Sequence, residues 1–164
     1  MNAINTSDNI LRVWKLAKSI EVGMLTTTGS AGMHSRPLQA LFDKESGSIW
    51  FIVNRNSAKV PEVEEHSAAQ LTFSDPSKGE HVVMKGKVEM NDDRARLKKL
   101  WSSGADIFFP KGPTDPDATL VRFQPEFAEF WSGGSGVMAF AVHLVEAKLT
   151  GRTPEVGDHA KVAL

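Results

Sequence analysis

Short alternating runs of apolar and polar residues dominate the chain and predict a protein built mainly from β-strands. The N-terminal part differs, because Ser7 is a good N-cap and the apolar residues from 10 to 20 recur at helical spacing. From Val22 the period changes to that of a strand. We expect strands at residues 22–28, 33–43 and 49–53, which short glycine-containing turns join into an antiparallel meander.

The middle of the chain predicts two short helices and two more strands. Ser57 is a suitable N-cap, and Glu62, Glu64 and Glu65 are expected to form a solvated face of the helix that follows it. Gly86 lies inside an apolar strand pattern, where a bulge or a barrel bend is common. We expect a helix after Ser57 and strands at 69–74 and 81–90. A second helix is expected to follow, with residues 91–93 as its N-terminal cap and its end near Trp101.

The C-terminal third contains a long loop followed by further regular elements. Residues 102–118 are rich in Gly and Pro, and a connection of about 17 residues is typical of a functional loop or one wrapped over the body. Ser135 and Gly151 are expected to bound an amphipathic helix as its N-cap and C-cap residues. The remaining expected elements are strands at 119–123 and 126–131 and a small polar tail at 152–164 that frays.

These elements predict a mainly β fold with flanking helices. Six to seven mostly antiparallel strands favour a small barrel over a doubly wound sheet. The length of 164 residues suggests one domain, which we assign to residues 1–151, with 152–164 as a C-terminal tail. The glycine-rich segment 133–136 lacks the spacing of a Rossmann or phosphate-binding loop, so a nucleotide site of those types is not supported.

Composition removes several classes of function. The chain has no Cys, which excludes thiolate metal sites, iron–sulfur clusters and thiol redox chemistry, and its five His residues form no ligand pair. The formal net charge of −1 argues against a general nucleic-acid surface. The apolar run 49–53 is too short to span a bilayer, and the N-terminus lacks the features of an export signal. We therefore expect a cytoplasmic protein with no metal, no nucleic acid and no membrane partner.

Three residues stand out as candidates for ligand chemistry. Arg36 lies in a strand directly before Pro37. Its side chain either meets a ligand at an edge of the sheet, or it points to solvent or pairs with an acid. Lys59 follows Ser57 by two residues, so a cation, a hydroxyl and free amides converge as in a phosphate site, unless this is an ordinary capped helix. Trp131 precedes a flexible Ser-Gly-Gly-Ser-Gly segment, where an indole either covers a flat ligand or partner surface or packs into the core.

Five segments in order then carry a family resemblance: residues 34–38 (HSRPL), 49–59 (IWFIVNRNSAK), 70–76 (QLTFSDP), 88–90 (VEM) and 129–132 (EFWS). In their order and spacing they resemble the pyridoxamine 5′-phosphate oxidase-like FMN-binding split barrels, most closely the general stress protein 26-like subgroup. The resemblance implies a split β-barrel with FMN, or FAD, as cofactor. It also implies a homodimer with flavin sites at the subunit interface.

The same resemblance implies which residues bind the cofactor. The strand arginine and the phosphate-binding Ser and Lys of the family match Arg36, Ser57 and Lys59. His81 matches a polar side chain that contacts the flavin in the family. Trp131 matches a tryptophan that reaches across the dimer to the flavin bound mainly by the other subunit. Backbone around residues 35–38 and 52–53 would follow the isoalloxazine ring, which completes the expected set: Ser35, Arg36, Pro37, Leu38, Ile52, Val53, Ser57, Lys59, His81 and Trp131.

Departures from the oxidase pattern narrow the expected function. Ala58 stands where the oxidases carry a second basic residue, and no basic residue follows Trp131 until His143. We therefore expect a stress-related, FMN-dependent oxidoreductase acting with a small-molecule or nicotinamide redox partner, and not an efficient pyridoxamine phosphate oxidase. The alternative is a non-catalytic flavin carrier or sensor. Use of the cleft for a haem or a deazaflavin stays open, and no catalytic residue is assigned.

Overall fold

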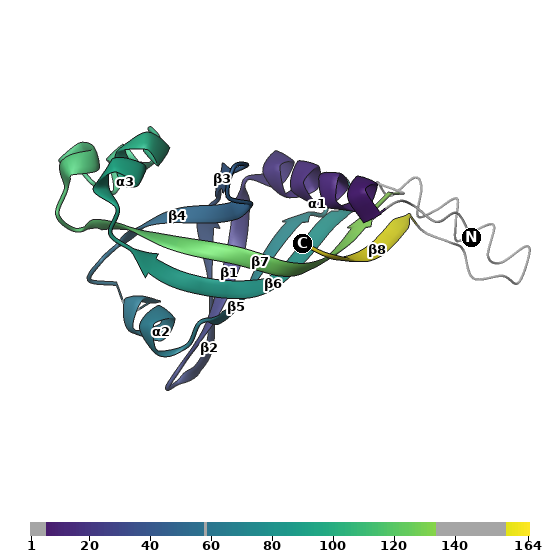
Figure 1. The fold of residues 1–164 in the computed structure, drawn as a ribbon, viewed down its shortest axis with the longest axis horizontal. Coiled ribbons are helices and arrows are strands. Elements are labelled where there is room, and N and C mark those ends of the chain that lie inside the picture. The colour runs from purple at the N-terminus through teal and green to yellow at the C-terminus, as the bar shows by residue number, and fades with distance from the viewer. Residues whose placement is uncertain (1–5, 58, 134–156) are drawn as a thin grey trace, which may run out of the picture.

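The computed structural model describes residues 6–57, 59–133 and 157–164, which form one antiparallel sheet with helices around it (Figure 1). The strand order is β2-β1-β5-β6-β7-β4-β3, and β8 pairs with β7. The strands are β1 (Val22–Gly29), β2 (Gly32–Gln39), β3 (Leu41–Asp43), β4 (Ser48–Asn54), β5 (Ala68–Asp75), β6 (Glu80–Asn91), β7 (Ala118–Ser132) and β8 (Asp158–Ala163).

Three helices lie outside the sheet in the described part of the chain. The helix α1 (Thr6–Ile20) packs an apolar side that includes Val13 and Ala17 against the sheet, and α2 (Lys59–Glu65) packs against β1 and β6. The helix α3 (Arg94–Leu100) begins after Asp93, whose side chain accepts a hydrogen bond from the Arg96 amide. Two 3-10 turns, η1 (Ala105–Ile107) and η2 (Gly112–Thr114), follow it. None of the described helices is long and apolar enough to cross a membrane.

The inner side of the curved sheet forms the main core. Alternate residues point inward along β1, β5 and β6, which show a buried–exposed period of two, whereas the first residues of β7 and most of β4 are buried on both faces. The largest fully buried side chains are aromatic: Phe51, Phe73, Phe123 and Phe130. This mostly antiparallel half-barrel with few helices confirms the expected split-barrel class.

One expected strand, residues 33–43, is broken at Ala40. Before the break β2 pairs with β1, and after it β3 pairs with β4. The buried Ala40 belongs to neither ladder, and its amide donates a hydrogen bond to the Glu21 carbonyl at 2.9 Å. The expected three-stranded meander is therefore only partly right: both of its hairpins are present, as β1–β2 and β3–β4, but β2 does not pair with β4, whose other neighbour is β7. The error arises because apolar alternation runs through Ala40 unchanged, and alternation carries no information about which strand is the partner.

Two expected strands, 119–123 and 126–131, are instead the single strand β7. Between the two expected strands lies Pro125, which cannot donate a hydrogen bond to a ladder. In the structure it pairs with Gly86, at the point where the β6–β7 register shifts, which confirms the irregularity expected at that glycine. The pairing of β7 with β4 ends at Phe123 and that with β8 starts at Phe127, so Pro125 lies in the interval between them.

The expected fraying of the tail is wrong for β8. Residues 158–163 pair with β7, and Val162 packs into the core. The tail pattern was misjudged because it is short and mostly polar, whereas a single buried side chain and a ladder suffice to place an edge strand. The expected helix bounded by Ser135 and Gly151 lies outside the described residues.

The bulge at Gly86 yields a stability prediction. A Cβ atom at this position would lie 2.1 Å from the Gln124 carbonyl oxygen, so Gly86→Ala must push two backbones apart. We expect the free energy of unfolding in urea to fall by about 1–3 kcal/mol. The control is Gly47→Asn, because Gly47 has φ +60° and open space around the missing Cβ, and Asn tolerates that conformation. Equal losses in both variants would contradict a steric role for Gly86.

Candidate functional site

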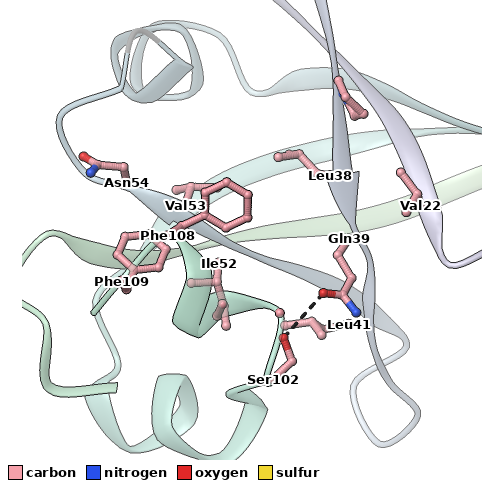
Figure 2. Close-up of a pocket in the computed structure, with 13 residues that line it drawn as sticks. Val22, Leu38, Gln39, Leu41, Ile52, Val53, Asn54, Ser102, Phe108 and Phe109 are labelled. Atoms are coloured by element: carbon pink, nitrogen blue, oxygen red, sulfur yellow. Dashed lines mark hydrogen bonds between the residues drawn. The ribbon is translucent and has the colours of Figure 1, made fainter. Parts of the chain in front are cut away.

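A cleft of about 440 Å³ lies where β2 and β4 face each other without pairing (Figure 2). The loop after α3 closes a third side of it. The cleft is lined by Val22, Pro37, Leu38, Gln39, Leu41, Ile52, Val53, Asn54, Ser102, Gly104, Ala105, Phe108 and Phe109. A mainly apolar cleft with a few polar groups is typical of a site for an organic ligand.

Four of the expected site residues meet in this cleft. Pro37 and Leu38 come from β2, and Ile52 and Val53 come from β4. These residues belong to two segments that are distant in the sheet order but adjacent across the cleft. The structure therefore brings together the residues that were expected along a flat ring.

Sequence reasoning missed the loop residues that line the same cleft. Phe108 is 76% exposed although it is a large apolar side chain, and Phe109 beside it is buried. The Gln39 side chain accepts a hydrogen bond from Ser102 at 3.4 Å, which connects β2 to this loop (Figure 2). The unusual length of segment 102–118 was the available signal, but length alone could not say which residues face a ligand.

Arg36 belongs to a cluster of charged and polar side chains around the buried Glu62 instead of pointing freely to solvent. Its Nη2 donates to Glu62 Oε1 at 2.7 Å and its Nη1 donates to Thr27 Oγ1 at 3.0 Å. Thr27 in turn donates to Glu62 Oε2 at 2.6 Å, and His34 Nδ1 lies 2.7 Å from Glu62 Oε1. We call Thr27, His34, Arg36 and Glu62 the Glu62 cluster; it confirms that Arg36 pairs with an acid.

The position of Glu62 corrects the expected solvated face of α2. Glu64 and Glu65 are exposed as expected, but the Glu62 side chain is only 9% exposed. The hydrogen bond from Arg36 is the main cause that lowers the pKa of Glu62 to about 2, with Thr27 and His34 adding to it against the opposing effect of burial. The carboxylate is therefore ionised at neutral pH. Its burial depends on a partner in β2, which the local pattern of α2 does not reveal.

Arg36 keeps donors for a further ligand. A guanidinium has five N–H groups, and the two hydrogen bonds to Thr27 and Glu62 leave three of them without a partner among the described residues. Its side chain is 24% exposed, so part of it can be reached from outside. An anion can therefore bind Arg36 while the Glu62 cluster stays intact.

Ser57 and Lys59 lie at the start of α2. The Ser57 hydroxyl is buried and has no hydrogen-bond partner among the described residues, which leaves it available to a ligand. Lys59 is the first residue of α2, but its side chain lies outside the part of the structure that is described. The orphaned hydroxyl and the free guanidinium donors are groups of the kind that bind a phosphate. Ser35 lies on β2 beside Arg36, and its hydroxyl shares a hydrogen bond with Thr26 at 2.7 Å.

His81 and Trp131 lie together but do not line the cleft of their own chain. They face each other in the β6–β7 ladder, and His81 is hydrogen-bonded to Ser74 at 2.9 Å. The Trp131 indole is 38% exposed and stacks on His159 of β8, with ring centroids 5.1 Å apart. The tryptophan is therefore on the surface, where it can contact a ligand or a partner chain.

The chain is similar to proteins of one family. A model of the family described as pyridoxamine 5′-phosphate oxidase like matches residues 8–155. A solved structure described as general stress protein 26 from Jannaschia sp. CCS1 is 29% identical, with 98% of this chain and 100% of that chain covered and a TM-score of 0.77. The general stress FMN/FAD binding protein of Xanthomonas citri is 26% identical, with coverage of 77% and 89% and a TM-score of 0.68. Comparison with curated proteins gave no match.

The charge of Glu62 yields a prediction about pH. Because the pKa of Glu62 falls from 4.5 to about 2, its ionisation stabilises the fold by about 3 kcal/mol above pH 4.5, and this is lost as the pH falls towards 2. We expect Glu62→Gln to lower the free energy of unfolding by about that amount at pH 7 and by much less at pH 3.

Urea unfolding at the two pH values checks this. The matched control is Glu65→Gln, which removes the same charge from an exposed position of α2 and is expected to change stability by less than about 0.5 kcal/mol. A loss in Glu62→Gln that does not depend on pH would show that the carboxylate charge is not what stabilises the cluster.

Proposed function

The chain belongs to the pyridoxamine 5′-phosphate oxidase-like family, and from this premise we propose that it is a flavin-binding oxidoreductase. FMN is the proposed cofactor and FAD the alternative. The single observation that carries the proposal is the cleft, because Pro37, Leu38, Ile52 and Val53 line it together. The relative from Xanthomonas citri, which is described as FMN/FAD binding, supports the same conclusion.

The proposed phosphate site combines three residues. Arg36 would contribute the donors that the Glu62 cluster leaves free, and Ser57 its buried hydroxyl. Lys59 adds a second positive charge at the start of α2. Charge-assisted hydrogen bonds contribute about 1.5–3 kcal/mol each, so this end of the site would select a flavin that carries a phosphate.

We propose further that the working unit is a homodimer. Val22 and Met24 of β1 and Phe127 and Trp131 of β7 are large, exposed and apolar. The burial pattern of the strands puts all four on the outward side of the sheet, and exposed large apolar side chains on one face are a common feature of interfaces. A two-fold axis would bring Trp131 and His81 of each subunit to the site of the other.

The flavin supplies the electron-transfer chemistry, and the chain binds and orients it. In the cleft, apolar side chains such as Leu38 and Phe109 exclude water from one side of the ring site. The proposed substrate is a small molecule or a nicotinamide cofactor, in a stress-related role. Efficient oxidation of pyridoxamine phosphate is not proposed, because the sequence after Trp131 has no basic residue before His143 to bind that phosphate.

One observation favours a second candidate function, a flavin carrier or sensor without turnover. None of the described residues that line the cleft has a titratable side chain. A proton donor or acceptor for catalysis would therefore have to come from the partner subunit, from the substrate or from solvent.

Anaerobic reduction distinguishes the two functions. For an oxidoreductase we expect a nicotinamide cofactor, added to the purified flavin-loaded protein, to bleach the flavin absorbance within seconds to minutes. Pyridoxamine phosphate is expected to do so far more slowly, since its phosphate lacks cationic partners. Absence of bleaching by either compound would favour the carrier, and efficient turnover of pyridoxamine phosphate would contradict the proposed substrate range.

The phosphate site is tested by the double variant Arg36→Ala, Lys59→Ala. Loss of two charged contacts is expected to weaken FMN binding by about 3 kcal/mol or more, which is at least about a hundredfold in Kd. Riboflavin, which has no phosphate, is the control ligand, and its affinity is expected to change little. Fluorescence titration of both flavins measures this; unchanged retention of FMN would mean that the phosphate binds elsewhere.

A further inference from the structure

The carboxylate of Glu62 has three polar partners, Thr27, His34 and Arg36, which lie on β1 and β2. Oε1 of Glu62 accepts from Arg36 and lies 2.7 Å from His34 Nδ1, while Oε2 accepts from Thr27. An ionised carboxylate only accepts hydrogen bonds, so His34 Nδ1 carries a hydrogen and donates it to Oε1. Both oxygens are thereby occupied inside the protein, and the side chain is 9% exposed.

The cluster holds the Arg36 guanidinium at two of its three nitrogens. Nη1 is bound to Thr27 and Nη2 to Glu62, at 3.0 and 2.7 Å. Two anchors on different nitrogens define the plane of this rigid group, and its remaining N–H groups then point in set directions. A guanidinium held in this way loses less conformational freedom when it binds an anion.

The same helix connects the cluster to the proposed phosphate site. Glu62 lies on α2, which starts at Lys59 directly after the segment of the orphaned Ser57 hydroxyl. Arg36 is followed by Pro37, which lines the cleft. The Glu62 side chain also approaches β1 closely, since a Cβ on Gly29 would lie 2.8 Å from Glu62 Cγ. A displacement of Glu62 would therefore reorient Arg36 relative to the start of α2.

We propose that Glu62 is a positioning residue for phosphate recognition: it holds the Arg36 guanidinium so that its free donors face the phosphate of the flavin. The inference rests on the proposed flavin-binding function. Glu62 acts through Arg36 and does not itself touch the ligand. If Glu62 instead competed with the phosphate for Arg36, removal of its charge would strengthen the binding of FMN, so the two roles predict opposite changes.

The test compares the Kd of FMN with that of riboflavin, by fluorescence titration at pH 7, in four forms of the full chain. In the wild type we expect FMN to bind at least about a hundredfold more tightly than riboflavin, in line with the loss expected for the double variant. In Glu62→Gln this preference is expected to fall about tenfold or more, with the Kd of riboflavin nearly unchanged. Glu65→Gln, which removes the same charge from an exposed site on α2, is expected to keep the wild-type preference.

A second variant keeps the test decisive if Glu62→Gln does not fold. Thr27→Val preserves the side-chain shape and every charge but removes the hydroxyl that binds both Arg36 and Glu62. We expect it to lower the preference for FMN in the same direction, by a smaller factor. A merely structural role of the cluster would weaken both flavins equally or lower only the thermal stability.

The outcomes separate this inference from the proposed function. A wild type that binds neither flavin would overturn the proposed function, and with it the role of Glu62. A wild type that binds both flavins equally would overturn the placement of the phosphate at Arg36. A wild type that prefers FMN, together with Glu62→Gln and Thr27→Val forms that keep or increase the preference, would overturn the positioning role alone.

Discussion

The hydrogen bond from the Ala40 amide to the Glu21 carbonyl marks the place where the backbone leaves one strand ladder and enters another. Before this residue β2 pairs with β1, and after it β3 pairs with β4, so two segments adjacent in the chain end up at opposite ends of the strand order. Consequently β2 and β4 face each other without forming ladder hydrogen bonds between them. The cleft exists because the sheet is open at this place.

Charge and apolar surface are separated within the candidate site. The described lining of the cleft has no titratable side chain, whereas the Glu62 cluster gathers a buried carboxylate, a guanidinium and an imidazole, and its Arg36 directly precedes Pro37 of the cleft. A seven-residue helix such as α2 is not stable by itself, and its contacts with β1 keep it in place. The interaction that attaches this helix to the sheet is thus also the one that orients Arg36.

The sequence predicted the elements far better than their partners. Alternation is a local property, so most strand positions and the bulge at Gly86 were predicted correctly. The break at Ala40 and the continuity of β7 through Pro125 were missed, because each depends on a strand that is distant in sequence. In the site, Pro37, Leu38, Ile52 and Val53 meet in the cleft as expected. The burial of Glu62 was not predicted, because its partner Arg36 lies 26 residues away. The side chain of Phe108 carried no signal beyond the length of its loop.

The strand β8 protects an edge of the sheet. Residues 127–132 of β7 have β6 on one side and β8 on the other, and the pairing with β4 does not extend to them. Without β8 this stretch would be a bare strand edge bearing the exposed apolar side chains of Phe127 and Trp131. Such an edge is a template on which strands of other molecules can pair. β8 replaces it with the edge of a short strand that carries Asp158 and Lys161, and a short, charged edge strand is a poorer template for such pairing.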